Sequence, residues 1–135
     1  MTDQDRGNWR SLVHKAEFHK VYTEGVKRVG HLLVVYLLPA DDMARAVVAS
    51  RKVGGAVQRN RAKRLLREAF RQGLPGRTED VVGLRERLFP DPDAANANAD
   101  RVGSGGLWVV LVARHSILEA GFRDVRAELD ELLSH

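Results

Sequence analysis

The sequence predicts a single α+β domain in which helices pack on a small central sheet. A chain of 135 residues suits one hydrophobic core, and 44% hydrophobic residues with 30% charged residues is too apolar a composition for a wholly disordered chain. Three short apolar segments, 31–38, 45–50 and 107–114, have the composition of strands. Amphipathic patterns with helical spacing precede, separate and follow these segments, which favours an α/β sandwich with helices packed on one sheet.

The first helix is predicted from apolar residues at helical spacing near the N-terminus. Phe18, Val21 and Tyr22 recur at i, i+3 and i+4 and form one apolar stripe. We expect this helix to run from about Leu12 to about Glu24 and to end at Gly25. Residues 1–10 are predicted to form a flexible arm.

The strands follow from short β-branched and aromatic segments. Residues 31–38 predict a buried strand, residues 39–42 a turn, residues 45–50 a second strand and residues 107–114 a third. If the second and third strands are parallel neighbours, the segment between them forms a βαβ crossover.

Two further helices and one long insertion complete the predicted domain, which spans residues 1–135. Gly54-Gly55 breaks the strand pattern, and 56–71 predicts a strong helix. Ser116 to Glu119 has the sequence of a capping box, so the last helix is expected to begin there and to continue to about residue 133. Residues 72–106, rich in Gly and Pro, are expected to form a surface insertion, mobile in part, with a short helical piece at about 81–88.

Positive charge is concentrated in one segment. The chain has 22 basic and 18 acidic residues, a net charge of only +4, yet residues 51–71 contain eight basic residues and one acidic residue. The remainder of the chain therefore has a net charge of −3. Charges act at a surface over about 10 Å, so the local charge of this segment, and not the total, predicts binding to phosphate groups.

The predicted helix at 56–71 separates a packing face from a cationic face. Alanine, leucine and phenylalanine lie on one arc, and Glu68 is the only acid. Basic side chains at i and i+4 repel one another unless an anion lies between them, so the helix is predicted to bind nucleic acid and not merely to face solvent. Asn60 adds a neutral hydrogen-bonding group suited to sugars or base edges. The residues of the cationic arc are Arg59, Asn60, Lys63, Arg64, Arg67 and Arg71.

Several other kinds of chemistry are not supported by the sequence. There is no cysteine, which excludes disulfides and thiol nucleophiles, and no apolar run exceeds seven residues against the roughly 20 that a membrane helix needs. The polar, acidic N-terminus does not resemble a secretory signal, so we expect a cytoplasmic protein without membrane association. The five histidines have no metal-ligand spacing, and no catalytic residue or metal site is predicted in the chain. Whether Asp41 or Asp42 attracts a metal is left open.

The segment 50–71 closely resembles the signature of the bacterial ribonuclease P protein component family. The shared motif is Ser50-Arg51-Lys52-Val53-Gly54, followed by Ala56-Val57, Arg59-Asn60-Arg61, Lys63-Arg64, Arg67-Glu68 and Phe70-Arg71. Residues 12–25, 33–36 and 109–114 are similar to the family's first helix, first long strand and last strand.

This resemblance implies a function, a set of partners and two groups of site residues. The family's protein is the small subunit of a ribonucleoprotein that removes the 5′ leader of precursor tRNA, while its RNA subunit holds the catalytic Mg²⁺ ions. The resemblance implies a left-handed βαβ crossover, ribonuclease P RNA and precursor tRNA as partners, and no obligate protein partner. The residues implied to bind the RNA subunit are Arg59, Asn60, Arg61, Lys63, Arg64, Arg67 and Arg71. Those implied to form the leader-binding cleft are Phe18, Tyr22, Tyr36, Ser50, Arg51 and Lys52.

Two alternative functions are also compatible with the sequence. A structural RNA-binding protein, such as a ribosomal or assembly factor, would use the same cationic helix but would not need the aromatic cleft. A DNA-binding module with residues 56–71 in a major groove is less favoured, because the sequence shows no helix-turn-helix partner before that helix.

Overall fold

The fold is described from a computed structural model, which covers residues 9–73, 83, 85–86, 89 and 106–134. Most of the predicted arm and of the predicted insertion lies outside the described residues. Within the insertion, residues 83, 85 and 86 are helical, in agreement with the short helical piece expected at about 81–88. Among the helices in the described ranges, none combines the length and apolarity of a membrane span.

Five strands form one mixed sheet in the order β1-β4-β5-β3-β2. The strands are β1 (Arg10–Ser11), β2 (Val26–Val29), β3 (Leu33–Ala40), β4 (Ala44–Val48) and β5 (Gly106–Ala113). β4 and β5 are parallel neighbours joined through helix α3 (Ala56–Gln72), so the predicted βαβ crossover is confirmed. The left-handedness of this crossover remains a prediction. β5 also pairs antiparallel with β3, which places the last strand at the centre of the sheet.

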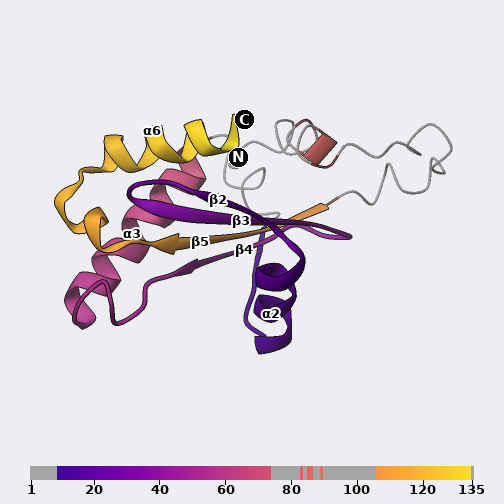
Figure 1. Ribbon diagram of the computed structural model, residues 1–135, viewed down its shortest axis with the longest axis horizontal. Coiled ribbons are helices and arrows are strands. Elements are labelled where there is room, and N and C mark those ends of the chain that lie inside the picture. Colours follow the sequence, from indigo (N-terminus) through magenta and orange to yellow (C-terminus); the bar gives the residue numbers. More distant parts are fainter. Residues whose placement is uncertain (1–8, 74–82, 84, 87–88, 90–105, 135) are drawn as a thin grey trace, which may run out of the picture.

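One face of the sheet is covered by helices α3 and α6 (Phe122–Leu133), which pack on each other and on the strands (Figure 1). Alternate residues of β3 and β5 point to this face because side chains alternate along a strand. The predicted packing face of α3 is confirmed, with Leu65 only partly buried. The principal buried side chains are Leu33, Val35, Leu37, Ala62, Leu66, Phe70, Leu107, Val109, Leu111, Val125, Leu129 and Leu133.

The opposite face is only partly covered, by helix α2 (Lys15–Glu24). Figure 1 shows α2 and α6 on opposite sides of the sheet, with α2 near one end of it and the start of α3 near the other. A smaller core lies under α2, formed by Leu12, Val21, Leu38, Ala44, Ala46 and Val110. The other residues of this face are half-buried or exposed, so the described part of the chain leaves an open sheet surface beside α2.

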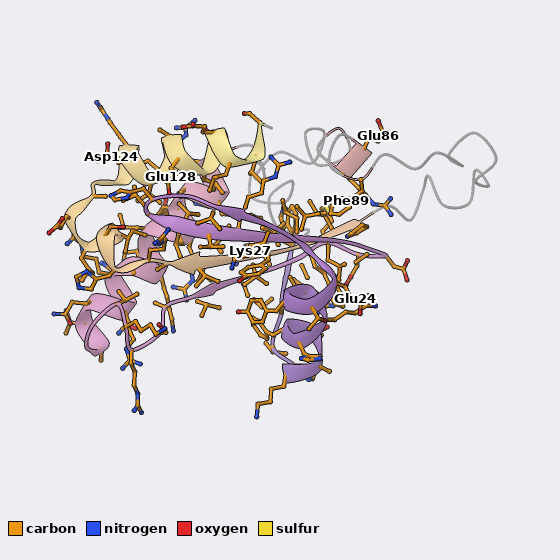
Figure 2. The ribbon with its side chains drawn as sticks, viewed as in Figure 1. Glu24, Lys27, Glu86, Phe89, Asp124 and Glu128 are labelled. Atoms are coloured by element: carbon orange, nitrogen blue, oxygen red, sulfur yellow. The ribbon has the colours of Figure 1, made fainter. Side chains whose placement is uncertain are left out.

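Glu128 of α6 ties the last helix to the turn between β2 and β3. Its carboxylate accepts hydrogen bonds from the backbone N–H groups of His31, Leu32 and Leu33 at 2.9, 2.7 and 3.0 Å. Figure 2 labels Glu128 on the side of α6 that faces these strands. One charged side chain thus satisfies three backbone donors that the turn would otherwise leave unpaired.

The Gly54-Gly55 turn has one position that favours glycine. Gly54 has a φ of 152°, a region that residues with a Cβ rarely adopt, and it reverses the chain between β4 and α3. Gly55 has ordinary extended backbone angles and precedes the first residue of α3. The backbone conformation of the turn therefore explains glycine at position 54 but not at position 55.

The structure differs from the sequence-based prediction in several places, among them residues 39 and 40, which were predicted to lie in a turn but belong to β3. The last helix does not begin at Ser116: a 3₁₀ helix, η2, spans His115–Glu119, and α6 starts only after Gly121. The predicted capping box is wrong because the Ser116 hydroxyl donates instead to the carbonyl of His31. Strands β1 and β2 were not predicted. Trp9, placed in the predicted arm, is buried and packs edge-to-face on Phe70, with ring centroids 4.9 Å apart.

Candidate nucleic-acid interface

Most of the cationic side chains of α3 lie on the part of the helix that faces away from the core. Strong helix formers fill this segment, and Ala62, Leu66, Ala69 and Phe70 recur at helical spacing and fix one face against the sheet. The opposite arc then faces solvent. We call the residues of this arc the cationic stripe: Arg59, Asn60, Lys63, Arg64, Arg67 and Arg71. All are exposed except Arg59 and Lys63, which are half-buried.

Much of the charge of the stripe is not neutralised within the protein. Arg71 pairs with Glu68 at 2.7 Å, and Gln72 donates to the same carboxylate at 3.1 Å, which lowers the pKa of Glu68. In the described part of the chain, Lys63, Arg64 and Arg67 form no ion pair. These three cations project from one side of one helix, which suits a polyanionic backbone better than an isolated anion.

The two arginines of the Arg-Asn-Arg motif lie on different sides of α3. They are two residues apart, which corresponds to about 200° around a helix. Arg59 lies next to Lys63 within the stripe, whereas Arg61 points toward η2 and donates from Nη1 to the carbonyl of Leu118 at 3.4 Å. The structure therefore separates Arg61 from Arg59 and Lys63 and places it at the far edge of the stripe, next to Arg64 three residues along the helix.

Arg45 is a further cation near the stripe and was not among the predicted site residues. It is a half-buried residue of β4, and its guanidinium lies 5.5 Å from the centre of the Phe70 ring. Burial, followed by the positive charge of Arg67, lowers the pKa of Arg45. An anion bound beside Arg67 would relieve this repulsion, so Arg45 adds to the positive potential of α3. The sequence around Arg45 does not predict this proximity, because Arg67 belongs to α3 and lies 22 residues further along the chain.

On the other face of the sheet, three predicted site residues form an aromatic cluster, consisting of Phe18, Tyr22 and Tyr36. The Tyr22 and Tyr36 rings meet edge-to-face with centroids 4.8 Å apart, and the Phe18 and Tyr22 centroids are 6.2 Å apart. Tyr22 is 41% exposed, while Phe18 and Tyr36 are half-buried. Burial, with a smaller effect of Tyr36, raises the pKa of Tyr22, so its hydroxyl remains a donor at neutral pH. Partly exposed rings of this kind offer surfaces on which unpaired bases can stack.

Lys27 extends the aromatic cluster with a positive charge. Lys27 pairs with Tyr36 across β2 and β3, and its ammonium lies 5.8 Å from the centre of the Tyr36 ring. A cation at this distance from an aromatic face is attracted to it. Lys27 was not predicted as a site residue because no strand was predicted at 26–29; such a strand would have placed Lys27 and Tyr36 on one face.

A row of four valines continues the open surface away from α2. Val29, Val34, Val112 and Val48 are cross-strand neighbours on β2, β3, β5 and β4, in that order. Val29 is 56% exposed and the other three are half-buried. We call this set the valine row. The valine row gives the open part of the sheet an apolar surface next to the aromatic cluster.

Ser50, Arg51 and Lys52 are exposed but do not join the aromatic cluster directly. They follow β4, and Ser50 lies four residues beyond Ala46, the β4 residue in the row of Tyr36, or roughly 13 Å along the strand direction. The valine row lies between the two groups. The structure thus places the predicted cleft residues at two ends of one surface, and Arg51 and Lys52 lie beside the start of α3.

No group of three or more His, Asp or Glu side chains converges within the ranges that the structure covers. The Asp42 carboxylate accepts hydrogen bonds from Arg10 and from Trp108 Nε1, the latter at 2.8 Å, and these contacts lower its pKa. Asp42 is therefore already bound to protein donors.

Comparison with known protein families gives a consistent result. A family described as Ribonuclease P matches residues 8–87. The chain is 28% identical over 131 residues to the ribonuclease P protein component of Clostridioides difficile, covering 96% of this chain and 93% of that protein. It is 32% identical over 119 residues to the same component of Caldanaerobacter subterraneus subsp. tengcongensis, covering 87% and 80%. The match to the component of a Nitratiruptor species is 46% identical over 63 residues but spans only 58% of that protein.

Comparison with solved structures supports the same relationship. The ribonuclease P protein from Thermotoga maritima superposes with a TM-score of 0.61 at 25% identity, over 92% of this chain and 94% of that one. The ribonuclease P protein of Staphylococcus aureus, at 19% identity and a TM-score of 0.61, has the same fold. The mixed sheet with helices packed on it is thus shared with these proteins.

Proposed function

Because the chain belongs to the ribonuclease P protein family, we propose that it is the protein subunit of a bacterial ribonuclease P and assists removal of the 5′ leader from precursor tRNA. Its partners are ribonuclease P RNA and precursor tRNA, in a cytoplasmic ribonucleoprotein. The RNA subunit holds the Mg²⁺ ions and performs the hydrolysis. The chain itself binds and orients RNA, and without the RNA subunit it is expected not to cleave precursor tRNA.

One observation supports this function above the others: two different RNA-binding chemistries occupy opposite faces of one sheet. The cationic stripe lies on α3, and the aromatic cluster with the valine row lies on the other face. Clustered cations suit the backbone of a folded RNA, whereas stacking surfaces suit unpaired bases. We assign the stripe to the RNA subunit and the open surface to the single-stranded leader.

The loop at Ser50–Lys52 connects these two surfaces. It lies between the end of β4, which contributes Val48 to the valine row, and the first turn of α3. A leader that runs from the aromatic cluster along the valine row would reach Arg51 and Lys52 and then the start of α3. The two cations are placed to contact leader phosphates where the leader approaches the RNA subunit.

A purely structural RNA-binding role is less well supported. A structural role would explain the cationic stripe, but it would not explain why partly exposed aromatic rings lie beside the apolar surface of the valine row. Reconstitution with a bacterial ribonuclease P RNA at low Mg²⁺ separates the two functions. We expect the protein to stimulate leader removal, and a protein that binds the RNA without stimulating cleavage would refute the proposed function.

The assignment of the two surfaces can be tested with two sets of substitutions. Replacing Arg64 and Arg67, two exposed cations of the stripe, with glutamine is expected to weaken binding to the RNA subunit and to reduce its salt dependence. Replacing Phe18 and Tyr22 with alanine is expected to weaken binding of the leader and to leave the affinity for the RNA subunit unchanged. Equal effects of both sets on both ligands would contradict the two-surface assignment.

A further inference from the structure

Helix α2 is attached to the sheet by little apolar surface. Of its ten residues only Val21 is fully buried, and Phe18 is half-buried. The helix nevertheless contributes two of the three rings of the aromatic cluster, so its position sets the geometry of that cluster. Polar contacts are therefore needed to fix where α2 lies.

Arg10 connects α2 to the turn between β3 and β4. Its Nη2 donates to Glu17 Oε2 at 2.8 Å, and its Nε donates to Asp42 Oδ2. Glu17 belongs to the first turn of α2, and its other oxygen accepts from the backbone N–H groups at the start of the helix, at 3.3 and 3.4 Å. One guanidinium thus bridges two carboxylates that belong to different elements.

Trp108 of β5 extends this network into the sheet. Its indole Nε1 donates to Asp42 Oδ1 at 2.8 Å, so both oxygens of Asp42 are bound. The Arg10 guanidinium lies 5.4 Å from the centre of the Trp108 ring, and the Lys20 ammonium of α2 lies 5.9 Å from it. The backbone N–H of Arg10 also donates to Met43 at 3.0 Å. We call Arg10, Glu17, Asp42 and Trp108 the polar network.

The polar network and the aromatic cluster lie on different flanks of α2. Phe18 and Tyr22 point toward Tyr36, whereas Glu17 points toward Arg10. Residues 17 and 22 are five positions apart on the helix, or about 140°. The network therefore acts on one side of α2 while the leader surface lies on the other.

We propose that the polar network is a positioning device that fixes α2 against the sheet and so sets the geometry in which the aromatic cluster receives the leader. This inference rests on the proposed function. The network residues do not stack on the leader; they hold the helix that carries two of the stacking rings. Arg10, Glu17 and Asp42 are thus positioning residues for leader binding.

Charge provides a test that separates positioning from direct electrostatic attraction. Glu17→Gln and Asp42→Asn each remove a negative charge near an RNA-binding surface, so electrostatics alone predicts tighter leader binding. If the polar network positions α2, both substitutions should instead weaken leader binding, because each one weakens the bridge through Arg10. Glutamine at 17 keeps an oxygen that can accept from the first backbone N–H groups of α2, so the helix start is preserved.

The experiment uses the protein assembled with a bacterial ribonuclease P RNA. Binding of precursor tRNA with a leader is compared with binding of mature tRNA for the wild type and for E17Q, D42N and R10Q. We expect E17Q and D42N to bind the leader-bearing tRNA about three- to tenfold more weakly, with KM raised and kcat at saturation unchanged. Binding of mature tRNA should not change. R10K should recover part of the R10Q loss, because one ammonium can still pair with a carboxylate.

Glu131→Gln is the matched control, since it removes an exposed carboxylate from α6, away from the leader surface. Circular dichroism and thermal unfolding show whether each variant is folded. Leader binding by E17Q and D42N as tight as, or tighter than, that of the wild type would overturn the inference. A wild-type protein that does not distinguish precursor from mature tRNA would instead refute the proposed function.

Discussion

The cationic stripe makes a quantitative prediction about salt dependence. We consider a triple variant in which Lys63, Arg64 and Arg67 are replaced with glutamine. None of the three forms an ion pair in the described part of the chain, so each is available for one phosphate contact. Glutamine is a good helix former, and the change removes repulsion between residues 63 and 67, so α3 should remain folded.

The size of the effect follows from counterion release. Each lost phosphate contact reduces the slope of log K against log salt concentration by about 0.7–0.9, so three contacts reduce it by about 2–3. Between about 50 and 200 mM salt, the wild type should therefore lose about 20–40-fold more affinity for the RNA subunit than the triple variant. Filter binding or fluorescence anisotropy over a salt series measures both slopes.

Two further variants make the interpretation specific. Replacing Arg123 and Arg126 of α6 with glutamine removes two cations outside the stripe and should change the slope little. Glu68→Gln should act in the opposite direction and tighten binding, because it removes the acid that pairs with Arg71. An unchanged slope in the stripe variant, or an equal reduction in the α6 control, would refute the assignment of the stripe to the RNA subunit.

Other predictions concern the fold and the leader surface. Glu128→Ala should lower the free energy of unfolding by about 2–3 kcal/mol in urea titrations, because three backbone N–H groups lose a charged acceptor; a loss below about 0.5 kcal/mol would contradict this. Gly106→Ala should reduce stability, because a Cβ there would lie 2.2 Å from a carbonyl oxygen of the β3–β4 turn, and an unchanged Tm would show that this turn moves freely. Tyr36→Ala should weaken leader binding by about 1–3 kcal/mol without affecting the RNA subunit, as measured by competition with leaders of different length. Arg10 lowers the pKa of Glu17 below its ordinary 4.5. The stabilisation by the Arg10–Glu17 ion pair is therefore present above pH 4.5 and is lost as the pH falls through the lowered pKa. The difference in Tm between Arg10→Gln and the wild type should accordingly shrink on acidification, and a constant difference from pH 7 to pH 3 would exclude the ion pair as its cause.

The prediction from sequence succeeded where a pattern is local and failed where a partner is distant. The helical spacing of α3 predicted its packing face, and the long apolar runs predicted β3 and β5. β1 and β2 were missed because they contain two and four residues, too few for an alternating pattern. The capping box at Ser116 was wrong because the hydroxyl found a tertiary acceptor on the β2–β3 turn.

The candidate site divides in the same way. The motif at 50–71 named the cationic residues of α3, and helical spacing already left Arg61 out of the cationic arc. Spacing could not show that Arg61 contacts η2 or that Arg45 lies near Arg67. The valine row was not recognisable either, because its members come from four strands and become neighbours only through the register of the sheet.

The sequence by itself determined the class of fold, the family and the charge of one helix, since composition, periodicity and a continuous motif are properties of neighbouring residues. A net charge of +4 was resolved along the chain into one strongly basic segment on an otherwise acidic protein. Only the tertiary structure decided the rest: that β5 lies between β3 and β4, that the cationic stripe and the aromatic cluster occupy opposite faces, and that Arg10 bridges α2 to a turn. These features depend on long-range pairing, which is selected by the packing of the whole domain and leaves no local trace in the chain.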